Sequence, residues 1–234
     1  FTPYHLDAIF VGHPVIESTI LYGNAEDFRA RYNISEDKKI MAILPGSRKN
    51  EVEHLLPVFL SAAQEFYQKN KDFCFVLPSV KTVEDKVREM TKDCDLPLHI
   101  LTTEEDRHGA FKASDVAIAA SGTVALELAM VDVPHIIAYH VSPLTAFLVR
   151  RFIKIQFVNL SNILLGRKIV PELLQEDCNK ENILRNVSEL LKKGDVYEKQ
   201  IEGFEKVREI LGFGEQTPSA NACDVLLKIA GKDA

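Results

Sequence analysis

Short apolar runs alternate along this chain with longer stretches in which apolar residues recur every three or four positions. The runs have the length of buried strands, and the longer stretches have the period of helices with one buried face. Strands are expected at 7–12, 39–44, 73–77, 98–101, 115–120 and 134–139. Strands that alternate with helices favour right-handed crossovers and a parallel sheet. The pattern predicts an α/β fold, a Rossmann-like parallel sheet with helices on both faces.

The helical stretches show where the sheet is covered and where the pattern changes. Asn50 is expected to cap a long helix, with Glu53 three residues later as in a capping box. Other helices are expected at 83–91, 105–113 and 123–130. After Cys178 only helices are predicted, at about 180–192, 196–211 and 219–230. We therefore expect one domain over residues 15–178 and a C-terminal helical extension over residues 179–234.

Composition is that of a soluble globular protein, since 46% of the 234 residues are hydrophobic and 26% are charged. The net charge of -6 argues against a general nucleic-acid-binding protein, which would normally be basic. The four cysteines form no C-x-x-C pair, which indicates reduced thiols in a cytosolic protein and no zinc site. No uncharged apolar stretch reaches the roughly 18 residues of a membrane span.

The first candidate for chemistry is the turn that follows the strand at 39–44. Gly46 removes a side chain where a ligand must approach the backbone, and Ser47 adds a hydroxyl beside it. Arg48 could make a bidentate contact with a phosphate group, and a helix begins here, whose first N–H groups suit an anion. The alternative is a tight turn with a solvated arginine.

The second candidate is the turn Ser121-Gly122-Thr123, at the carboxyl end of the strand at 115–120. Open α/β sheets bind ligands at this end of their strands. Glu127 lies one helical turn beyond Thr123, and its carboxylate could accept hydrogen bonds from both hydroxyls of a ribose. In the alternative interpretation Ser121 only caps a helix and Glu127 lies at the surface. Two such turns in one sheet suggest a diphosphate held from two sides, as in a nucleotide-sugar site.

The chain resembles the lipid-A-disaccharide synthase family in a series of blocks that follow the family's order. They are Phe10–Pro14, Leu44–Arg48 with Glu51, Ser121–Thr123 with Leu126 and Glu127, Asn159–Leu164 and Pro171–Gln175. One departure is Leu160-Ser161-Asn162, where the family usually has Leu-Pro-Asn; Asn162 is retained. The family consists of inverting, metal-independent glycosyltransferases of the GT-B fold, with two Rossmann-like domains and the active site between them.

The resemblance implies a role for each block. Gly46, Ser47 and Arg48 would face the donor diphosphate from one side. On its other side would stand Ser121, Gly122 and Thr123, while Glu127 would hold the ribose. Asn162 and Gln175 would line the cleft near the sugar, unless Asn162 is a turn residue and Gln175 a surface residue. No metal ligand and no cofactor beyond the UDP-sugar donor is implied.

The implied reaction joins UDP-2,3-diacylglucosamine to 2,3-diacylglucosamine 1-phosphate, giving a β-1,6 tetraacyl disaccharide 1-phosphate and UDP. Residues 1–14 would be the end of a first domain and the crossing into the second. The acceptor pocket and an acidic general base are expected in that first domain, so no carboxylate of this chain is assigned a catalytic role. We expect this chain to bind the donor and not to turn over alone.

A membrane contact and a dimer are also expected. The segment Pro143–Lys154 is strongly apolar with a basic end. It is either a core helix whose Arg150, Arg151 and Lys154 reach water, or an interfacial helix on anionic lipid. The resemblance implies a cytoplasmic enzyme at the inner face of the bacterial inner membrane, and family members can exchange C-terminal portions in a homodimer.

Two other functions compete with this interpretation. One is another GT-B enzyme that uses UDP-N-acetylglucosamine, such as a 2-epimerase or the peptidoglycan N-acetylglucosaminyltransferase. The other is a non-catalytic nucleotide-binding or dimerisation module. Preference for an acylated donor would exclude a 2-epimerase, and failure of UDP to stabilise the chain would favour the module.

Overall fold

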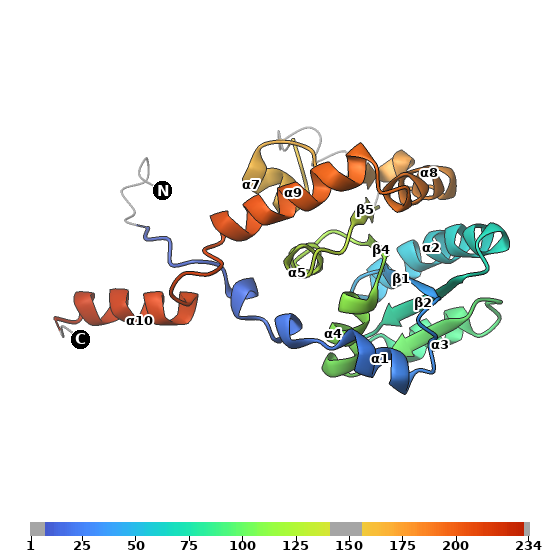
Figure 1. Ribbon diagram of the computed structural model, residues 1–234, viewed down its shortest axis with the longest axis horizontal. Coiled ribbons are helices and arrows are strands. Elements are labelled where there is room, and N and C mark those ends of the chain that lie inside the picture. Colours follow the sequence, from blue (N-terminus) through green and yellow to red (C-terminus); the bar gives the residue numbers. More distant parts are fainter. Residues whose placement is uncertain (1–7, 141–155, 232–234) are drawn as a thin grey trace.

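The computed structural model describes residues 8–140 and 156–231, in which a six-stranded parallel sheet forms the centre of the molecule (Figure 1). The strand order is β3-β2-β1-β4-β5-β6. The strands are β1 (Lys39–Leu44), β2 (Phe73–Pro78), β3 (Leu98–Leu101), β4 (Val116–Ala119), β5 (His135–Tyr139) and β6 (Glu172–Leu174). The predicted α/β class is confirmed. The direction of winding reverses between β1 and β4, which creates the crevice where such sheets bind ligands.

Helices cover both faces of the sheet, as the alternating strand residues require. Ile40 and Ala42 of β1 belong to the core beneath α1, α4, α5 and α9, whereas Met41 and Ile43 belong to the core beneath α2, α3 and α8. The α-helices are α1 (Ala25–Arg31), α2 (Lys49–Lys69), α3 (Glu84–Thr91), α4 (Glu104–Ala113), α5 (Val124–Met130), α7 (Leu160–Leu165), α8 (Lys180–Leu191), α9 (Asp195–Ile210) and α10 (Pro218–Ile229). Short 3₁₀ turns lie at η2 (Pro14–Glu17), η3 (Thr19–Tyr22) and η4 (Gln175–Asp177).

The strand predicted at 7–12 is wrong over its described part, because residues 8–12 have no strand structure. Ile9 and Phe10 are exposed, and Gly12 has a φ of +100°, outside the β region. The segment lies instead beside α10, where Asn221 Nδ2 donates to the Val11 carbonyl at 3.1 Å. An apolar run becomes a strand only where a neighbouring strand completes its hydrogen bonds.

The start of α2 also differs from the prediction. The helix begins at Lys49, so Arg48 is the capping residue, with an extended backbone (φ −103°, ψ 141°). Glu51 accepts the backbone N–H of Arg48 at 3.4 Å, the contact that the sequence assigned to Glu53 and Asn50. The capping residue thus lies two residues earlier than the predicted Asn50, after a turn in which Gly46 has a left-handed φ of +103°.

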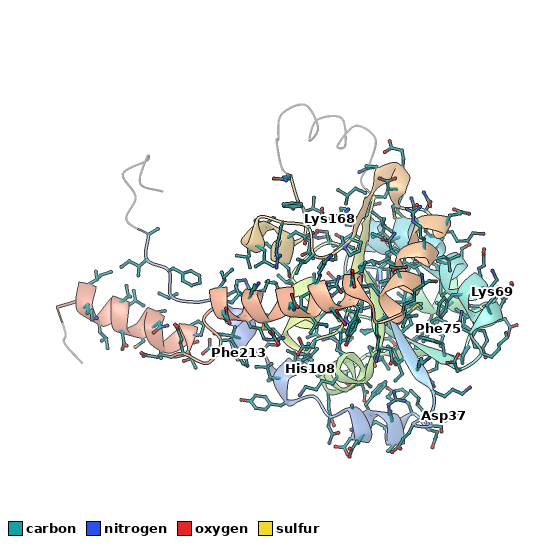
Figure 2. The ribbon with its side chains drawn as sticks, turned by 45° about the horizontal axis from the view of Figure 1, so that its top comes forward. Asp37, Lys69, Phe75, His108, Lys168 and Phe213 are labelled. Atoms are coloured by element: carbon teal, nitrogen blue, oxygen red, sulfur yellow. The ribbon has the colours of Figure 1, made fainter. Side chains whose placement is uncertain are left out.

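The C-terminal helices divide into two that pack on the sheet and one that projects from it. Phe204 and Val207 of α9 belong to one core, and Val187 of α8 belongs to the other. By contrast, α10 extends away from the body beyond the turn that carries Phe213 (Figures 1 and 2). Its contact with the rest of the chain includes a hydrogen bond from Ser219 Oγ to Glu17 at 2.8 Å.

His135 joins β5 to α9 in the interior. It is completely buried, its ring stacks on Phe204 with 5.2 Å between centroids, and its backbone N–H donates to Gln200 Oε1 at 2.7 Å. Gln200 Nε2 in turn donates to the carbonyls of His135 and Ile169. Among the described residues, His135 Nε2 has no hydrogen-bond partner. Burial of the ring therefore lowers the pKa of His135 from 6.5 to about 4.

We expect the chain to lose stability as the pH falls from about 6.5 to about 4. In this window the unfolded chain binds a proton at His135 that the folded chain excludes. The loss reaches about 2 kcal/mol at pH 5, at roughly 1.4 kcal/mol per pH unit. Urea unfolding at pH 7 and pH 5 measures the loss. Between these pH values the free energy of unfolding of His135→Phe should fall by less than that of the wild-type chain. Exposed His54 supplies the control His54→Gln, and an unchanged pH dependence in His135→Phe contradicts the assignment.

Candidate functional site

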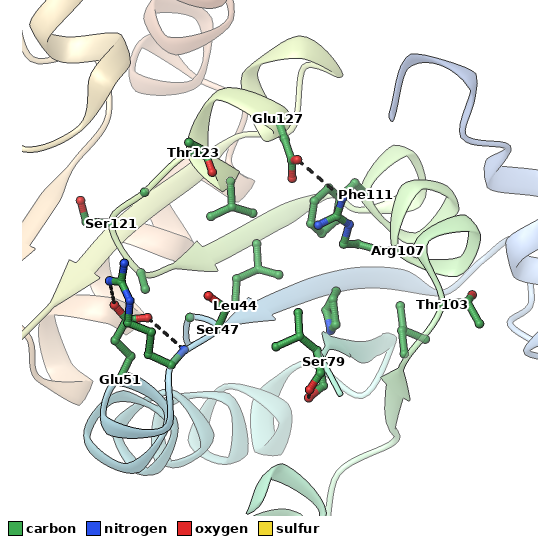
Figure 3. Close-up of a pocket in the computed structure, with 18 residues that line it drawn as sticks. Leu44, Ser47, Glu51, Ser79, Thr103, Arg107, Phe111, Ser121, Thr123 and Glu127 are labelled. Atoms are coloured by element: carbon green, nitrogen blue, oxygen red, sulfur yellow. Dashed lines mark hydrogen bonds and ion pairs between the residues drawn. The ribbon is translucent and has the colours of Figure 1, made fainter. Parts of the chain in front are cut away.

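A cavity of about 410 Å³ opens at the carboxyl ends of β1 and β4, where the strand order reverses (Figure 3). Its size lies in the range of small-molecule sites. Four strand ends contribute to its wall. The lining residues are Leu44, Gly46, Ser47, Arg48, Glu51, Pro78, Ser79, Val80, Leu101, Thr103, Arg107, Phe111, Ala120, Ser121, Gly122, Thr123, Val124 and Glu127.

Glu51 organises the turn after β1. Its carboxylate accepts the backbone N–H of Arg48 and, at 2.9 Å, the Arg48 guanidinium. Tyr139 donates its hydroxyl to the same carboxylate at 3.3 Å. The left-handed φ of Gly46, +103°, favours glycine at this turn, and a Cβ there would also overlap the Glu51 carboxylate. The Arg48 side chain is 80% exposed, so its guanidinium stands at the mouth of the cavity, available to an anion.

The turn after β4 lines the cavity with Ser121, Gly122 and Thr123. Gly122 has a φ of +150°, and a Cβ there would meet nothing within 4 Å, so the backbone is approachable at this point. The capping residue of α5 is Thr123, whose side chain makes no capping hydrogen bond. The alternative in which Ser121 caps the helix is therefore wrong; Ser121 Oγ instead donates to the Val158 carbonyl at 3.5 Å.

Glu127 lies on the wall of the cavity, with 18% of its side chain exposed. Figure 3 shows its carboxylate facing Arg107 of α4, and the distance from Glu127 Oε1 to Arg107 Nη2 is 3.6 Å. Burial raises the pKa of Glu127, whereas the positive charge of Arg107 lowers it and the carboxylate of Glu104 raises it. The glutamate is thus half-buried and beside a cation, not at the surface.

The opposite end of the cavity was not predicted from the sequence. It is built from Pro78, Ser79 and Val80 after β2, and from Leu101 and Thr103 around the end of β3. Neither segment has a glycine-rich or charged motif. The one available signal was topological, since the carboxyl ends of all parallel strands meet at the same edge of a sheet.

Seven of the nine predicted site residues meet in this cavity. They are Gly46, Ser47, Arg48, Ser121, Gly122, Thr123 and Glu127. The two turns are 73 residues apart (from Arg48 to Ser121) but adjoin because β1 pairs with β4, so that Leu44 lies opposite Ala119. Asn162 and Gln175 are not among the lining residues.

Asn162 is completely buried, and the fold uses all of its polar side-chain atoms. Its Nδ2 donates to the Val170 carbonyl at 2.9 Å and to Glu172 Oε1 at 2.8 Å. Its Oδ1 accepts the N–H groups of Ile169 and Val170 at 2.8 and 2.9 Å. The structure therefore gives Asn162 a structural role. Gln175 is half-buried, with a φ of +54°, directly after the edge strand β6. Contact of these two residues with a donor sugar stays a prediction.

The structure bears on two further expectations, a membrane contact and the absence of metal ligands, only within the residues that it describes. The segment Pro143–Lys154 lies outside the described residues. Within residues 8–140 and 156–231, no helix has the length and apolar character needed to cross a bilayer. In the same part of the chain, no group of three or more His, Cys, Asp or Glu side chains could hold a metal ion.

Comparison with known sequences gives extended matches. A profile of the lipid-A-disaccharide synthetase family matches residues 1–225. The lipid-A-disaccharide synthase of Rhodospirillum centenum is 40% identical over 99% of this chain and 59% of its own length. That of Gluconobacter oxydans is 38% identical over 97% of this chain and 55% of its own length. The chain thus spans somewhat more than half the length of these relatives.

Among solved structures, the fold is shared with enzymes of low sequence identity. A UDP-GlcNAc 2-epimerase from Neisseria meningitidis, solved with bound UDP-GlcNAc, superposes with a TM-score of 0.67 at 15% identity, over 97% of this chain and 58% of that one. WaaG, a glycosyltransferase involved in lipopolysaccharide biosynthesis, gives a TM-score of 0.55 at 12% identity, over 86% of this chain and 50% of that one. These similarities show a Rossmann-like fold of the GT-B kind.

Proposed function

The chain belongs to the lipid-A-disaccharide synthetase family, and from this premise we propose that its cavity binds the UDP-sugar donor of a glycosyl transfer. The observation that carries the proposal is the meeting of the two turns, Gly46–Arg48 and Ser121–Thr123, in one cavity with Glu127. A diphosphate between the turns would receive the Arg48 guanidinium from one side and the approachable backbone at Gly122 from the other. A ribose would then reach the Glu127 carboxylate.

The donor proposed is UDP-2,3-diacylglucosamine and the acceptor 2,3-diacylglucosamine 1-phosphate. The bond between C1 of the donor sugar and its diphosphate oxygen breaks, and a bond forms from C1 to the 6-hydroxyl oxygen of the acceptor with inversion. The hydroxyl proton passes to a general base, to which no residue of this chain is assigned. UDP leaves with its negative charge held by the two turns. We propose that the step needs no metal ion.

Two alternative functions remain distinguishable. The 2-epimerase from Neisseria meningitidis has the same fold and was solved with UDP-GlcNAc, but it is only 15% identical to this chain. The family match over residues 1–225 favours the disaccharide synthase. Tighter binding of the acylated donor than of UDP-GlcNAc supports that choice, whereas equal binding supports an epimerase. A non-catalytic module is supported if no uridine nucleotide binds.

Titration with UDP tests the donor site directly. In EDTA, we expect UDP to raise the melting temperature, since a ligand at 100 times its Kd adds about 2.7 kcal/mol to the free energy of unfolding. Arg48→Ala should weaken UDP binding about tenfold or more, because a hydrogen bond to a charged group contributes roughly 1.5–3 kcal/mol. Arg185→Ala, at an exposed arginine of α8 outside the cavity, is the matched control. No shift with UDP, or equal affinity in both variants, contradicts the proposal.

We also propose peripheral contact with the inner face of the bacterial inner membrane through Pro143–Lys154, and a homodimer. The segment combines apolar residues with Arg150, Arg151 and Lys154, so it suits anionic lipid although the whole chain carries a charge of -6. Flotation with anionic liposomes should recover the wild-type chain and lose the double variant Arg150→Glu, Arg151→Glu. Equal flotation of the two contradicts the membrane contact.

A further inference from the structure

The hydrogen bonds of the Arg107 side chain in α4 do not by themselves explain why the fold places an arginine here. Its Nε is buried and has no hydrogen-bond partner within the described part of the chain. Its Nη2 donates a hydrogen bond to His108 Nε2 at 3.2 Å, and lies 3.6 Å from the nearest carboxylate oxygens of both Glu104 and Glu127. A separation of 3.6 Å is longer than a direct hydrogen bond.

Other arginines of this chain serve the fold in a different way. Arg208 donates to the Ala129 carbonyl at 2.8 Å and to Asp132 at 2.7 Å, which ties α9 to the end of α5. Arg29 donates to the carbonyls of Ser35 and Lys38 at 3.0 and 2.9 Å. Arg107 forms no such bond to a backbone carbonyl among the described residues. A half-buried cation with an unsatisfied N–H destabilises a fold, so its position calls for another explanation.

That explanation lies in the neighbouring carboxylate. Glu127 sits on the cavity wall with 18% of its side chain exposed, and burial favours its neutral form. The charged groups that face it are Arg107, which favours ionisation, and Glu104, which opposes it. Across the cavity, Arg48 and Glu51 are paired with each other. Arg107 is therefore the neighbouring cation that offsets part of the burial of Glu127, whose pKa still lies above its usual value.

The distance between the two groups has a second consequence. At 3.6 Å the guanidinium attracts the carboxylate without a direct hydrogen bond occupying Oε1. Figure 3 shows the carboxylate beside the Arg107 guanidinium, and both residues line the cavity. An ionised carboxylate accepts hydrogen bonds and donates none, so it is suited to two adjacent hydroxyl groups.

We propose that Arg107 is a positioning residue for nucleotide recognition, which holds Glu127 ionised and directed into the cavity to accept both hydroxyls of a ribose. The inference rests on the proposed function, because it assumes that a nucleotide occupies this cavity. A carboxylate held in this way makes the site selective for ribonucleotides over 2′-deoxyribonucleotides. A deoxyribose leaves one buried carboxylate oxygen without its hydrogen bond, and sites built on such bonds reject the analogue that lacks them.

Calorimetric titration with UDP and with 2′-deoxy-UDP, at pH 6 and pH 8, tests the inference. The wild-type chain should prefer UDP about tenfold or more at both values. Without the positive charge of Arg107, Glu127 takes up a proton more readily. In Arg107→Gln the preference for UDP should therefore fall to about threefold or less at pH 6 and recover in part at pH 8, where Glu127 loses the proton. Arg107→Lys retains the charge and should restore most of the preference at pH 6. Arg185→Gln, at an exposed arginine of α8 outside the cavity, should behave as wild type.

Two results would overturn the inference. One is that Arg107→Gln prefers UDP over 2′-deoxy-UDP as strongly as the wild-type chain does at both pH values. The other is an equal loss of affinity for both nucleotides at both pH values, which would place Arg107 in phosphate binding or in folding. If the melting curve shows that Arg107→Gln is unfolded, the test rests on Arg107→Lys. Its preference for UDP over 2′-deoxy-UDP at pH 6 is then compared with that of the wild-type chain, and loss of the preference overturns the inference. Failure of the wild-type chain to bind either nucleotide would instead contradict the proposed function.

Discussion

Replacing Asn162 with alanine is expected to lower the free energy of unfolding by about 3–5 kcal/mol, a large part of the stability of an ordinary domain. The substitution removes four hydrogen bonds at once, to the N–H groups of Ile169 and Val170, the Val170 carbonyl and Glu172. The partners stay buried, and each unsatisfied group costs roughly 1–3 kcal/mol. Urea denaturation measures the change.

A matched control separates this role from the sugar contact that the sequence predicted for Asn162. Within the described part of the chain, the side chain of Asn186 in α8 makes one hydrogen bond, to the Asn182 carbonyl at 2.8 Å, and Asn186→Ala should lose about 1 kcal/mol or less. If Asn162→Ala is nearly as stable as wild type but binds a UDP-sugar more weakly than wild type does, the structural role is wrong and the sugar contact is supported. Lower stability with unchanged affinity for the UDP-sugar supports the structural role.

Replacing Glu127 with glutamine is expected to weaken UDP binding by about 10- to 100-fold. The carboxylate is half-buried, and hydrogen bonds from a ribose to a charged acceptor contribute roughly 1.5–3 kcal/mol. The amide keeps the size of the side chain but replaces one acceptor oxygen with a donor. The unfolding free energy should change by no more than about 1 kcal/mol, since the substitution also removes a charge from a partly buried position. Isothermal titration with UDP measures the affinity.

Inorganic pyrophosphate supplies the discriminating ligand for Glu127. It lacks a ribose, so its binding should be the same in wild type and in Glu127→Gln. Glu205→Gln, at an exposed acid of α9 outside the cavity, should leave both ligands unaffected. A parallel loss of pyrophosphate and UDP binding in Glu127→Gln would mean that the glutamate acts on the diphosphate side of the cavity or on the fold.

The elements predicted most accurately are those with strong local patterns. The strand expected at 39–44 has the same bounds in β1, and the apolar run at 73–77 lies within β2. Both are buried from either face, so their sequence is a continuous run of apolar residues. The long helix after β1 was also predicted, because the spacing of its buried residues matches the helical period.

The elements that were missed are short or depend on distant partners. Strand β6 has three residues, too few for an apolar pattern, and forms because β5 offers its free edge. Helix α7 has six residues, and its course is set by the bonds of Asn162 to residues 169 and 170. Residues 8–12 have a strand-like pattern but no neighbouring strand, so they run beside α10 instead.

For this protein, then, the order of apolar and polar residues determined the α/β class, most of the strands and the two turns that carry Arg48 and Ser121, because these depend on neighbours in sequence. Only the tertiary structure decided that the turns share one cavity, that Asn162 is buried in the fold, and that Arg107 stands beside Glu127. The pairing of β1 with β4 and the packing of α4 against the sheet bring together residues far apart in sequence, and no local pattern encodes those distances.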